Sequence, residues 1–178
     1  MARYARVEFE RGLAIVTLDR PDRRNAISND LGADLLAAVE QVAADPKARA
    51  VLLRGEGGMF CVGGDVKDMA AGAATEKTGD AQKIAHLRNL MRVSELLHDM
   101  AKPTVAQLEG AAAGGGLSLA LACDLRVAGR STKITTAFAK VGLSGDYGGT
   151  YYLTKMLGSA QARELYLLSP VLSGKEDH

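Results

Sequence analysis

The chain has 178 residues, of which 47% are hydrophobic, so one domain with a core of ordinary size is expected. Its 22 basic and 21 acidic residues leave a formal charge of +1, and this balance argues against nucleic acid or an anionic membrane as a partner. The two cysteines, Cys61 and Cys123, stand in apolar stretches, which favours buried thiols over a disulfide framework or a metal site.

Targeting signals are not evident. The first residues lack the apolar core of a signal peptide. The longest apolar run, residues 111–123, is too short and too rich in glycine to span a bilayer. We therefore expect a cytoplasmic protein with no membrane partner.

The first third of the chain predicts a hairpin, a helix and a strand. Strand patterns around residues 7–9 and 13–18 flank Arg11-Gly12, a hairpin signal. Ser28 is a good helix N-cap, and apolar residues then recur on one helical face: Leu31, Leu35, Val39 and Val42. Residues 50–53 predict a buried strand that runs towards a glycine-rich turn at 62–65.

The middle of the chain predicts a loop, a long helix and a strand. Residues 70–80 are small and polar, and they are the best candidate for a mobile loop over a pocket. Residues 81–101 predict an amphipathic helix with one apolar side made of Ile84, Leu87, Met91 and Leu97. A strand from residue 104 then leads to three glycines, Gly114 to Gly116, and to a buried helix at 117–122.

The last part predicts two strands, at 125–128 and near 133–138, and a further glycine-rich turn at 142–150. That turn opens a helix over 151–157, and Ser159 caps another helix that ends near Leu168. Short strands followed by a helix thus recur along the chain. This recurrence predicts a mixed α/β fold in which successive β–β–α turns stack.

Two glycine turns that follow strands, at 62–65 and 114–116, are the first candidates for chemistry. The first amides of a helix have no internal partner and lie at the positive end of its dipole. If amides from both turns converged, they would form an oxyanion hole for developing negative charge. On spacing alone, two tight packing turns are the simpler interpretation.

Asp146 is the one acid in the glycine-rich turn at 142–150, at a helix start. It could be a general acid or base whose pKa is raised by burial. It could equally be an N-cap carboxylate. The residues themselves leave both open.

Other chemistry is weakly supported. Ser118, in Gly-Leu-Ser-Leu-Ala, loosely matches the nucleophile elbow of serine hydrolases, but the only histidine after Asp146 is His178, the last residue. His86 and His98 are more simply surface residues. Nucleotide and metal-binding motifs are absent, so no metal and no bound cofactor are expected.

Four segments together carry a specific resemblance: residues 18–26, 59–69, 109–124 and 138–150. In their order and spacing the chain resembles the enoyl-CoA hydratase/isomerase (crotonase) superfamily. The resemblance implies a crotonase-like spiral of β–β–α turns, an acyl-CoA thioester as substrate, and a homo-oligomer, either a trimer or a hexamer. It places the carbonyl oxygen between the amides of Gly64 and Gly115. It assigns the coenzyme A groove to Arg24, Ala26, Val62, Asp65, Val66 and Lys67.

The departures from the family pattern bear on the mechanism. Typical hydratases of the family use two glutamates, and the matching positions here are Ser118 and Phe138. Asp146 falls where isomerase-type and dehalogenase-type members place their acid, and the segment around it looks most like the epoxyphenylacetyl-CoA isomerases of phenylacetate degradation. The resemblance thus implies an isomerase that uses Asp146. The alternatives are a hydratase that adds water to a 2-enoyl-CoA and an inactive acyl-CoA-binding subunit.

Members of the superfamily normally continue through further C-terminal helices. The resemblance therefore implies that residues 1–178 form the core domain without that helical region. It also predicts an uncovered apolar face near residues 165–172, and hence self-association.

Overall fold

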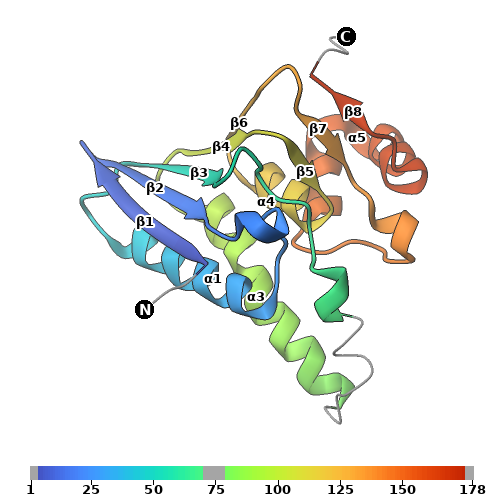
Figure 1. The fold of residues 1–178 in the computed structure, drawn as a ribbon, viewed down its shortest axis with the longest axis horizontal. Helices are drawn as coiled ribbons and strands as arrows, with labels where there is room; N and C mark the ends of the chain where they lie inside the picture. The colour runs from blue at the N-terminus through green and yellow to red at the C-terminus, as the bar shows by residue number, and fades with distance from the viewer. Residues whose placement is uncertain (1–3, 70–78, 175–178) are drawn as a thin grey trace.

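In the computed structural model, the described part of the chain comprises residues 4–69 and 79–174. Apart from its last two residues, the loop predicted at 70–80 lies outside that part. Two sheets, three long helices and one shorter buried helix make up most of the described fold (Figure 1).

The larger sheet has the order β1-β2-β3-β4-β6 and forms from strands β1 (Ala5–Glu10), β2 (Leu13–Leu18), β3 (Ala50–Gly55), β4 (Thr104–Leu108) and β6 (Leu125–Ala128). β1 and β2 are the predicted antiparallel hairpin, and all the other pairs are parallel. The carboxyl ends of β2, β3 and β4 therefore meet at one edge. Segments that follow these strands gather there, which is where open α/β sheets usually bind ligands.

The smaller sheet has the order β5-β7-β8 and forms from β5 (Ala111–Ala113), β7 (Lys133–Thr135) and β8 (Leu172–Ser173). The prediction of a strand reaching residue 138 was wrong, because β7 ends at Thr135 and Phe138 opens a 3-10 helix, η2 (Phe138–Val141). β5 and β8 were not predicted. Both are too short to show an alternating apolar pattern.

The helices are α1 (Asn29–Ala44), α3 (Asp80–Asp99), α4 (Gly115–Ala122) and α5 (Gly149–Leu168), with a short 3-10 turn, η1 (Pro21–Arg23), after β2. α1 and α3 cover one face of the larger sheet, while α5 lies beside the smaller sheet (Figure 1). α4 is buried along its whole length and packs against α3 and α5. The chain therefore stacks strand–strand–helix units as predicted.

The cap and the apolar face predicted for α1 are confirmed. The Ser28 hydroxyl accepts a hydrogen bond from the Leu31 amide at 3.2 Å, and the four apolar residues of the predicted face are buried against the sheet. α5 also follows the prediction of two helices, because Gly158 adopts a φ of 80° and interrupts it just before Ser159.

The apolar face predicted for the long helix was partly wrong. Ile84 and Leu87 are 52% and 44% exposed, whereas Leu90, Val93 and Leu97 are buried. The reason is geometric, since the first turns of α3 project beyond α1 and the sheet (Figure 1). Only the second half of the helix covers the core.

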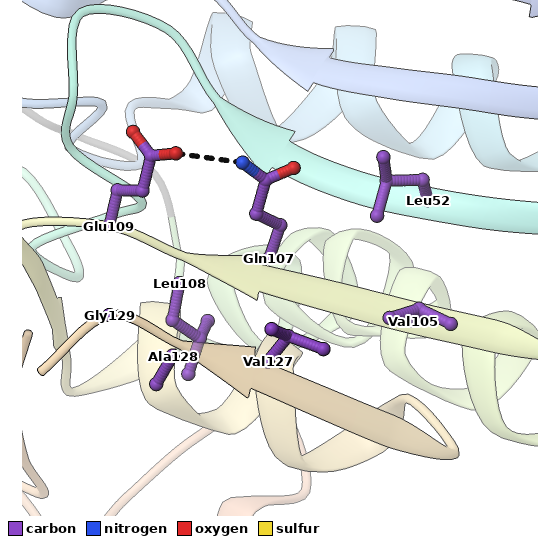
Figure 2. Close-up of a pocket in the computed structure, with 8 residues that line it drawn as sticks. All are labelled: Leu52, Val105, Gln107, Leu108, Glu109, Val127, Ala128 and Gly129. Atoms are coloured by element: carbon purple, nitrogen blue, oxygen red, sulfur yellow. Dashed lines mark hydrogen bonds between the residues drawn. The ribbon is translucent and has the colours of Figure 1, made fainter. Parts of the chain in front are cut away.

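The outer face of the larger sheet is only partly covered. Leu52, Val105 and Val127 line a hollow of about 360 Å³ across β3, β4 and β6, and Gln107 donates to Glu109 at its edge (Figure 2). The buried strand predicted at 50–53 thus has Val51 and Leu53 buried, whereas Leu52 is only partly buried.

Candidate active site

The first glycine turn follows β3 and lies against the segment that follows β2. The Ile27 amide donates to the Gly63 carbonyl at 2.8 Å, and the Asp65 amide donates to the Ile27 carbonyl at 3.0 Å. These two bonds turn the peptide N–H of Gly64, which lies between them, away from Ile27. Gly64 is exposed, and its N–H has no acceptor within residues 4–69 and 79–174.

The second glycine turn joins β5 to α4. Gly114 has a φ of 50°, and Gly115 is the first residue of α4, so its N–H has no carbonyl one turn earlier in the helix. Gly116 must be glycine, because a Cβ there would lie 2.5 Å from the Cys61 carbonyl oxygen. A Cβ on Gly63, in turn, would lie 3.4 Å from the Gly115 nitrogen. The two turns are therefore in contact.

Asp146 lies beside these turns. A Cβ on Gly115 would be only 3.2 Å from Asp146 Oδ1. Oδ1 is buried and has no hydrogen-bond partner among the described residues. Burial raises the pKa of this carboxyl to about 6.

The geometry does not favour the capping interpretation of Asp146. The N-cap of α5 is Gly148, and no side chain caps that helix. Asp146 instead contributes its backbone carbonyl, which accepts from the Gly149 amide at 3.1 Å. Tyr147 next to it has a φ of 49°, which is unusual for a residue with a side chain and marks a constrained turn.

A groove runs past the carboxylate. It consists of two adjoining cavities of about 350 and 400 Å³. Both are lined by Gly64, Met69, Phe138, Leu143 and Asp146. The first cavity extends past residues 27–29 at the start of α1 and along Leu87 and Leu90 of α3, and the second extends along the two glycine turns. A ligand in the groove could thus reach the amides and the carboxylate at once.

Phe138 and Ser118 provide no second carboxylate. Phe138 is buried, and its ring stacks on Tyr166 with a centroid distance of 5.8 Å and an angle of 4°. Ser118 is 1% exposed and its hydroxyl donates to the Gly114 carbonyl at 3.3 Å. Ser118 lines neither cavity of the groove, so the structure gives no support to a serine hydrolase. His98 is exposed and packs on Tyr152, as expected of a surface residue.

The expected binding residues are distributed unevenly. Val62, Val66 and Gly115 line the second cavity. Arg24 and Lys67 are exposed, while Ala26 and Asp65 are buried, and none of these four lines the groove. The structure therefore places these four around the groove and not in its walls.

Sequence reasoning missed Arg20. Its Nη1 donates to Asp65 Oδ2 at 2.8 Å. Burial opposes ionisation of Asp65, but the bonds from Arg20 and from the Asp68 amide outweigh it and hold the pKa of Asp65 below its usual value. No local pattern in the sequence signals this pair, because 45 residues separate the partners.

Two further searches bear on the class of site. Among the described residues, no group of three or more His, Cys, Asp or Glu side chains is arranged to hold a metal ion. None of the described helices has the length and apolar character needed to cross a membrane.

Comparisons with known proteins define the class. The family model for enoyl-CoA hydratase/isomerase matches residues 8–178. The chain is 35% identical to the 1,2-epoxyphenylacetyl-CoA isomerase of Escherichia coli. The alignment is 180 positions long and covers 100% of this chain and 67% of that protein. It is also 35% identical to the human mitochondrial methylglutaconyl-CoA hydratase, over 95% of this chain and 48% of that protein.

Solved structures agree. An enoyl-CoA hydratase from Polaromonas superposes with a TM-score of 0.87 and 32% identity, over 96% of this chain and 65% of that one. The chain thus belongs to the enoyl-CoA hydratase/isomerase family and has the crotonase fold. It spans about two thirds or less of the length of these relatives.

Proposed function

We propose that the groove binds an acyl-CoA thioester and that the site shifts a carbon–carbon double bond along the acyl chain. The thioester oxygen would accept hydrogen bonds from the Gly64 and Gly115 amides. Negative charge that develops on this oxygen as an enolate forms would be stabilised by about 3 kcal/mol per donor. Carbon atoms conjugated to the carbonyl would thereby become acidic enough for a carboxylate to deprotonate.

The observation that carries the proposal is the state of Asp146. Its buried Oδ1 has no hydrogen-bond partner in the described structure, faces Gly115, and belongs to a carboxyl whose pKa is raised to about 6. Such a group is a competent base near neutral pH. It would remove a proton from one carbon of the enolisable chain and return it to another, so that a single residue completes the cycle.

Hydration of a 2-enoyl-CoA is the second candidate. The name of the human relative, methylglutaconyl-CoA hydratase, favours it. Against it, Phe138 and Ser118 are the positions that, by the resemblance in sequence, correspond to the two carboxylates of typical hydratases of the family. Asp146 would then have to activate a water molecule alone.

The deciding experiment compares 3-hexenoyl-CoA and crotonyl-CoA as substrates for the native chain, Asp146→Asn and Asp99→Asn. Asp99→Asn is the matched control, because this exposed carboxylate lies at the far end of α3. We expect isomerisation of 3-hexenoyl-CoA, a loss of about 10²- to 10⁴-fold in Asp146→Asn, and no loss in the control. Full turnover in Asp146→Asn would refute the proposal, and hydration of crotonyl-CoA without isomerisation would favour the second candidate.

An inactive acyl-CoA-binding subunit is the remaining alternative, and tight coenzyme A binding without turnover on either thioester would favour it. A cytoplasmic location and a trimer or hexamer stay predictions. The human relative is named as mitochondrial, so family membership does not fix the compartment.

A further inference from the structure

Arg20 occupies a nearly enclosed position between two segments that border the groove. Its side chain is 12% exposed, and its guanidinium carbon lies 5.6 Å from the centre of the Tyr4 ring. Nη1 donates to Asp65 Oδ2 at 2.8 Å and also to the Ala26 carbonyl at 3.1 Å. One nitrogen thus joins the turn after β2 to the turn after β3.

Asp65 connects the Arg20 guanidinium to the backbone that follows Gly64. Its second oxygen, Oδ1, accepts from the amides of Lys67 and Asp68 at 3.1 and 3.3 Å, at the start of the helical residues 66–69. The residue is 6% exposed, so water competes little for these bonds. The carboxylate therefore fixes the chain immediately after Gly64.

Ile27 completes the constraint from the other side. Its amide donates a hydrogen bond to the Gly63 carbonyl, and its carbonyl accepts one from the Asp65 amide. The preceding residue, Ala26, accepts a hydrogen bond from Arg20 through its carbonyl. Gly64 thus lies between two residues whose backbones are hydrogen-bonded to Ile27, and it lines both cavities of the groove. A glycine has no side chain of its own to hold such a position, so the neighbours must supply the rigidity.

We propose that Arg20 is a positioning residue that aims the Gly64 N–H at the bound carbonyl oxygen through its ion pair with Asp65. The inference rests on the proposed function, since it assumes that this amide is an oxyanion donor. It also gives Asp65 a role that the resemblance did not imply. Asp65 lines neither cavity of the groove, and it holds the turn through the hydrogen bonds that it accepts from the Lys67 and Asp68 amides.

Lysine should not replace Arg20 fully. The guanidinium is planar and rigid, and it places its N–H groups in fixed directions, whereas a lysine ammonium is a compact and strongly hydrated charge on a flexible stem. Removing the arginine alone would leave the Asp65 carboxylate buried without its partner, which costs stability. The test therefore needs a variant that removes both charges.

The test compares the native chain with Arg20→Lys, Arg20→Met and the double variant Arg20→Met/Asp65→Asn. The asparagine keeps an oxygen for the Lys67 and Asp68 amides while it removes the unpaired charge. Arg92→Met is the matched control, because Arg92 forms an exposed ion pair with Glu40 on α1, at 3.0 Å and away from the groove. Folding is checked by circular dichroism and thermal unfolding.

Two readouts separate positioning from stability. One is kcat against KM for 3-hexenoyl-CoA. The other is the infrared carbonyl band of bound ¹³C-carbonyl crotonyl-CoA, which moves to lower frequency as the hydrogen bonds to the oxygen strengthen. We expect the folded Arg20→Met/Asp65→Asn variant to lose about 10- to 100-fold in kcat with little change in KM, and to lose part of the carbonyl shift. Arg20→Lys should lie between this variant and the native chain.

Native kcat and a native carbonyl band in the folded double variant would overturn the inference. So would an equal loss in Arg92→Met. These results are distinct from failure of the proposed function, in which the native chain itself would show neither turnover of 3-hexenoyl-CoA nor a shifted carbonyl band.

Discussion

The carboxylate of Asp146 faces Gly115 so closely that a methyl group on Gly115 would lie 3.2 Å from Oδ1. Gly115 begins α4 and Asp146 precedes α5, so two helix starts bring an amide and a carboxylate together where the two cavities of the groove adjoin. A reacting carbon next to a thioester carbonyl would lie between them.

The first prediction concerns the pH dependence of turnover. Asp146 must be ionised to accept a proton, and burial raises its pKa to about 6. We therefore expect kcat/KM for 3-hexenoyl-CoA to be constant above pH 7 and to fall about tenfold per pH unit well below 6. Steady-state rates between pH 4.5 and 8 measure it. A profile that stays flat to pH 5 would show that Asp146 is not the base.

The second prediction concerns stability. The folded-state pKa of Asp146, about 6, exceeds the ordinary value of 3.8, so burial favours the protonated form. Its contribution to stability is fully present below pH 3.8 and is lost as the pH rises through about 6. A difference of about two pKa units corresponds to at most about 3 kcal/mol at pH 7.

We therefore expect Asp146→Asn to raise the free energy of unfolding at pH 7 by about 1–3 kcal/mol, with little effect at pH 4. Urea unfolding of both chains at the two pH values measures this. Equal effects at pH 4 and pH 7 would contradict a buried, charged Asp146. A variant that is more stable but inactive would agree with a site in which a buried base lowers stability and is required for activity.

The third prediction concerns space at the start of α4. In Gly115→Ala, the new methyl group would also lie 3.3 Å from side-chain atoms of Ile27 and Tyr147. We expect a loss of about 10²-fold in kcat, because the amide and the carboxylate would be pushed apart, with a stability cost of about 1–3 kcal/mol. Gly79→Ala is the control, since nothing lies within 4 Å of a Cβ there. Similar kinetics in both variants would argue against an oxyanion donor at Gly115.

Local signals were sufficient for much of the fold. The hairpin, the Ser28 cap and the break at Gly158 depend on a few neighbouring residues, and the structure contains all three. The exposure of Ile84 could not be read from periodicity, because an apolar stripe shows which side of a helix is apolar but not how far the partner surface extends.

The site was partly predictable for a similar reason. The glycine turns and Asp146 have sequence patterns, and the structure brings them together. The Arg20–Asp65 pair has none, because it exists only once the Ile27–Gly64 bridge has brought two turns into register. The same long-range dependence hid β8, which pairs with β7 across nearly forty residues of chain.

The fourth prediction concerns the thiols. Cys61 and Cys123 are buried and unpaired, and burial raises the pKa of each to about 12. We expect neither to react with iodoacetamide in the folded chain at pH 8, whereas both should react in 6 M guanidinium chloride, because only an accessible thiolate is nucleophilic. Mass spectrometry counts the adducts. Rapid labelling of the folded chain would show that the region around Cys61, which includes the first glycine turn, opens readily.

The last prediction concerns the end of α5. Leu167, Leu168 and Val171 are 75%, 69% and 52% exposed, which forms an apolar patch at the predicted position. Water contact at such a patch is unfavourable, so we expect the chain to self-associate through it. Sedimentation velocity over a range of concentrations should show larger species that Leu167→Ser/Leu168→Ser abolishes. Ile84→Ser, which removes an exposed apolar side chain from α3, should leave association unchanged. If the double variant sedimented like the native chain, assembly would have to use another face.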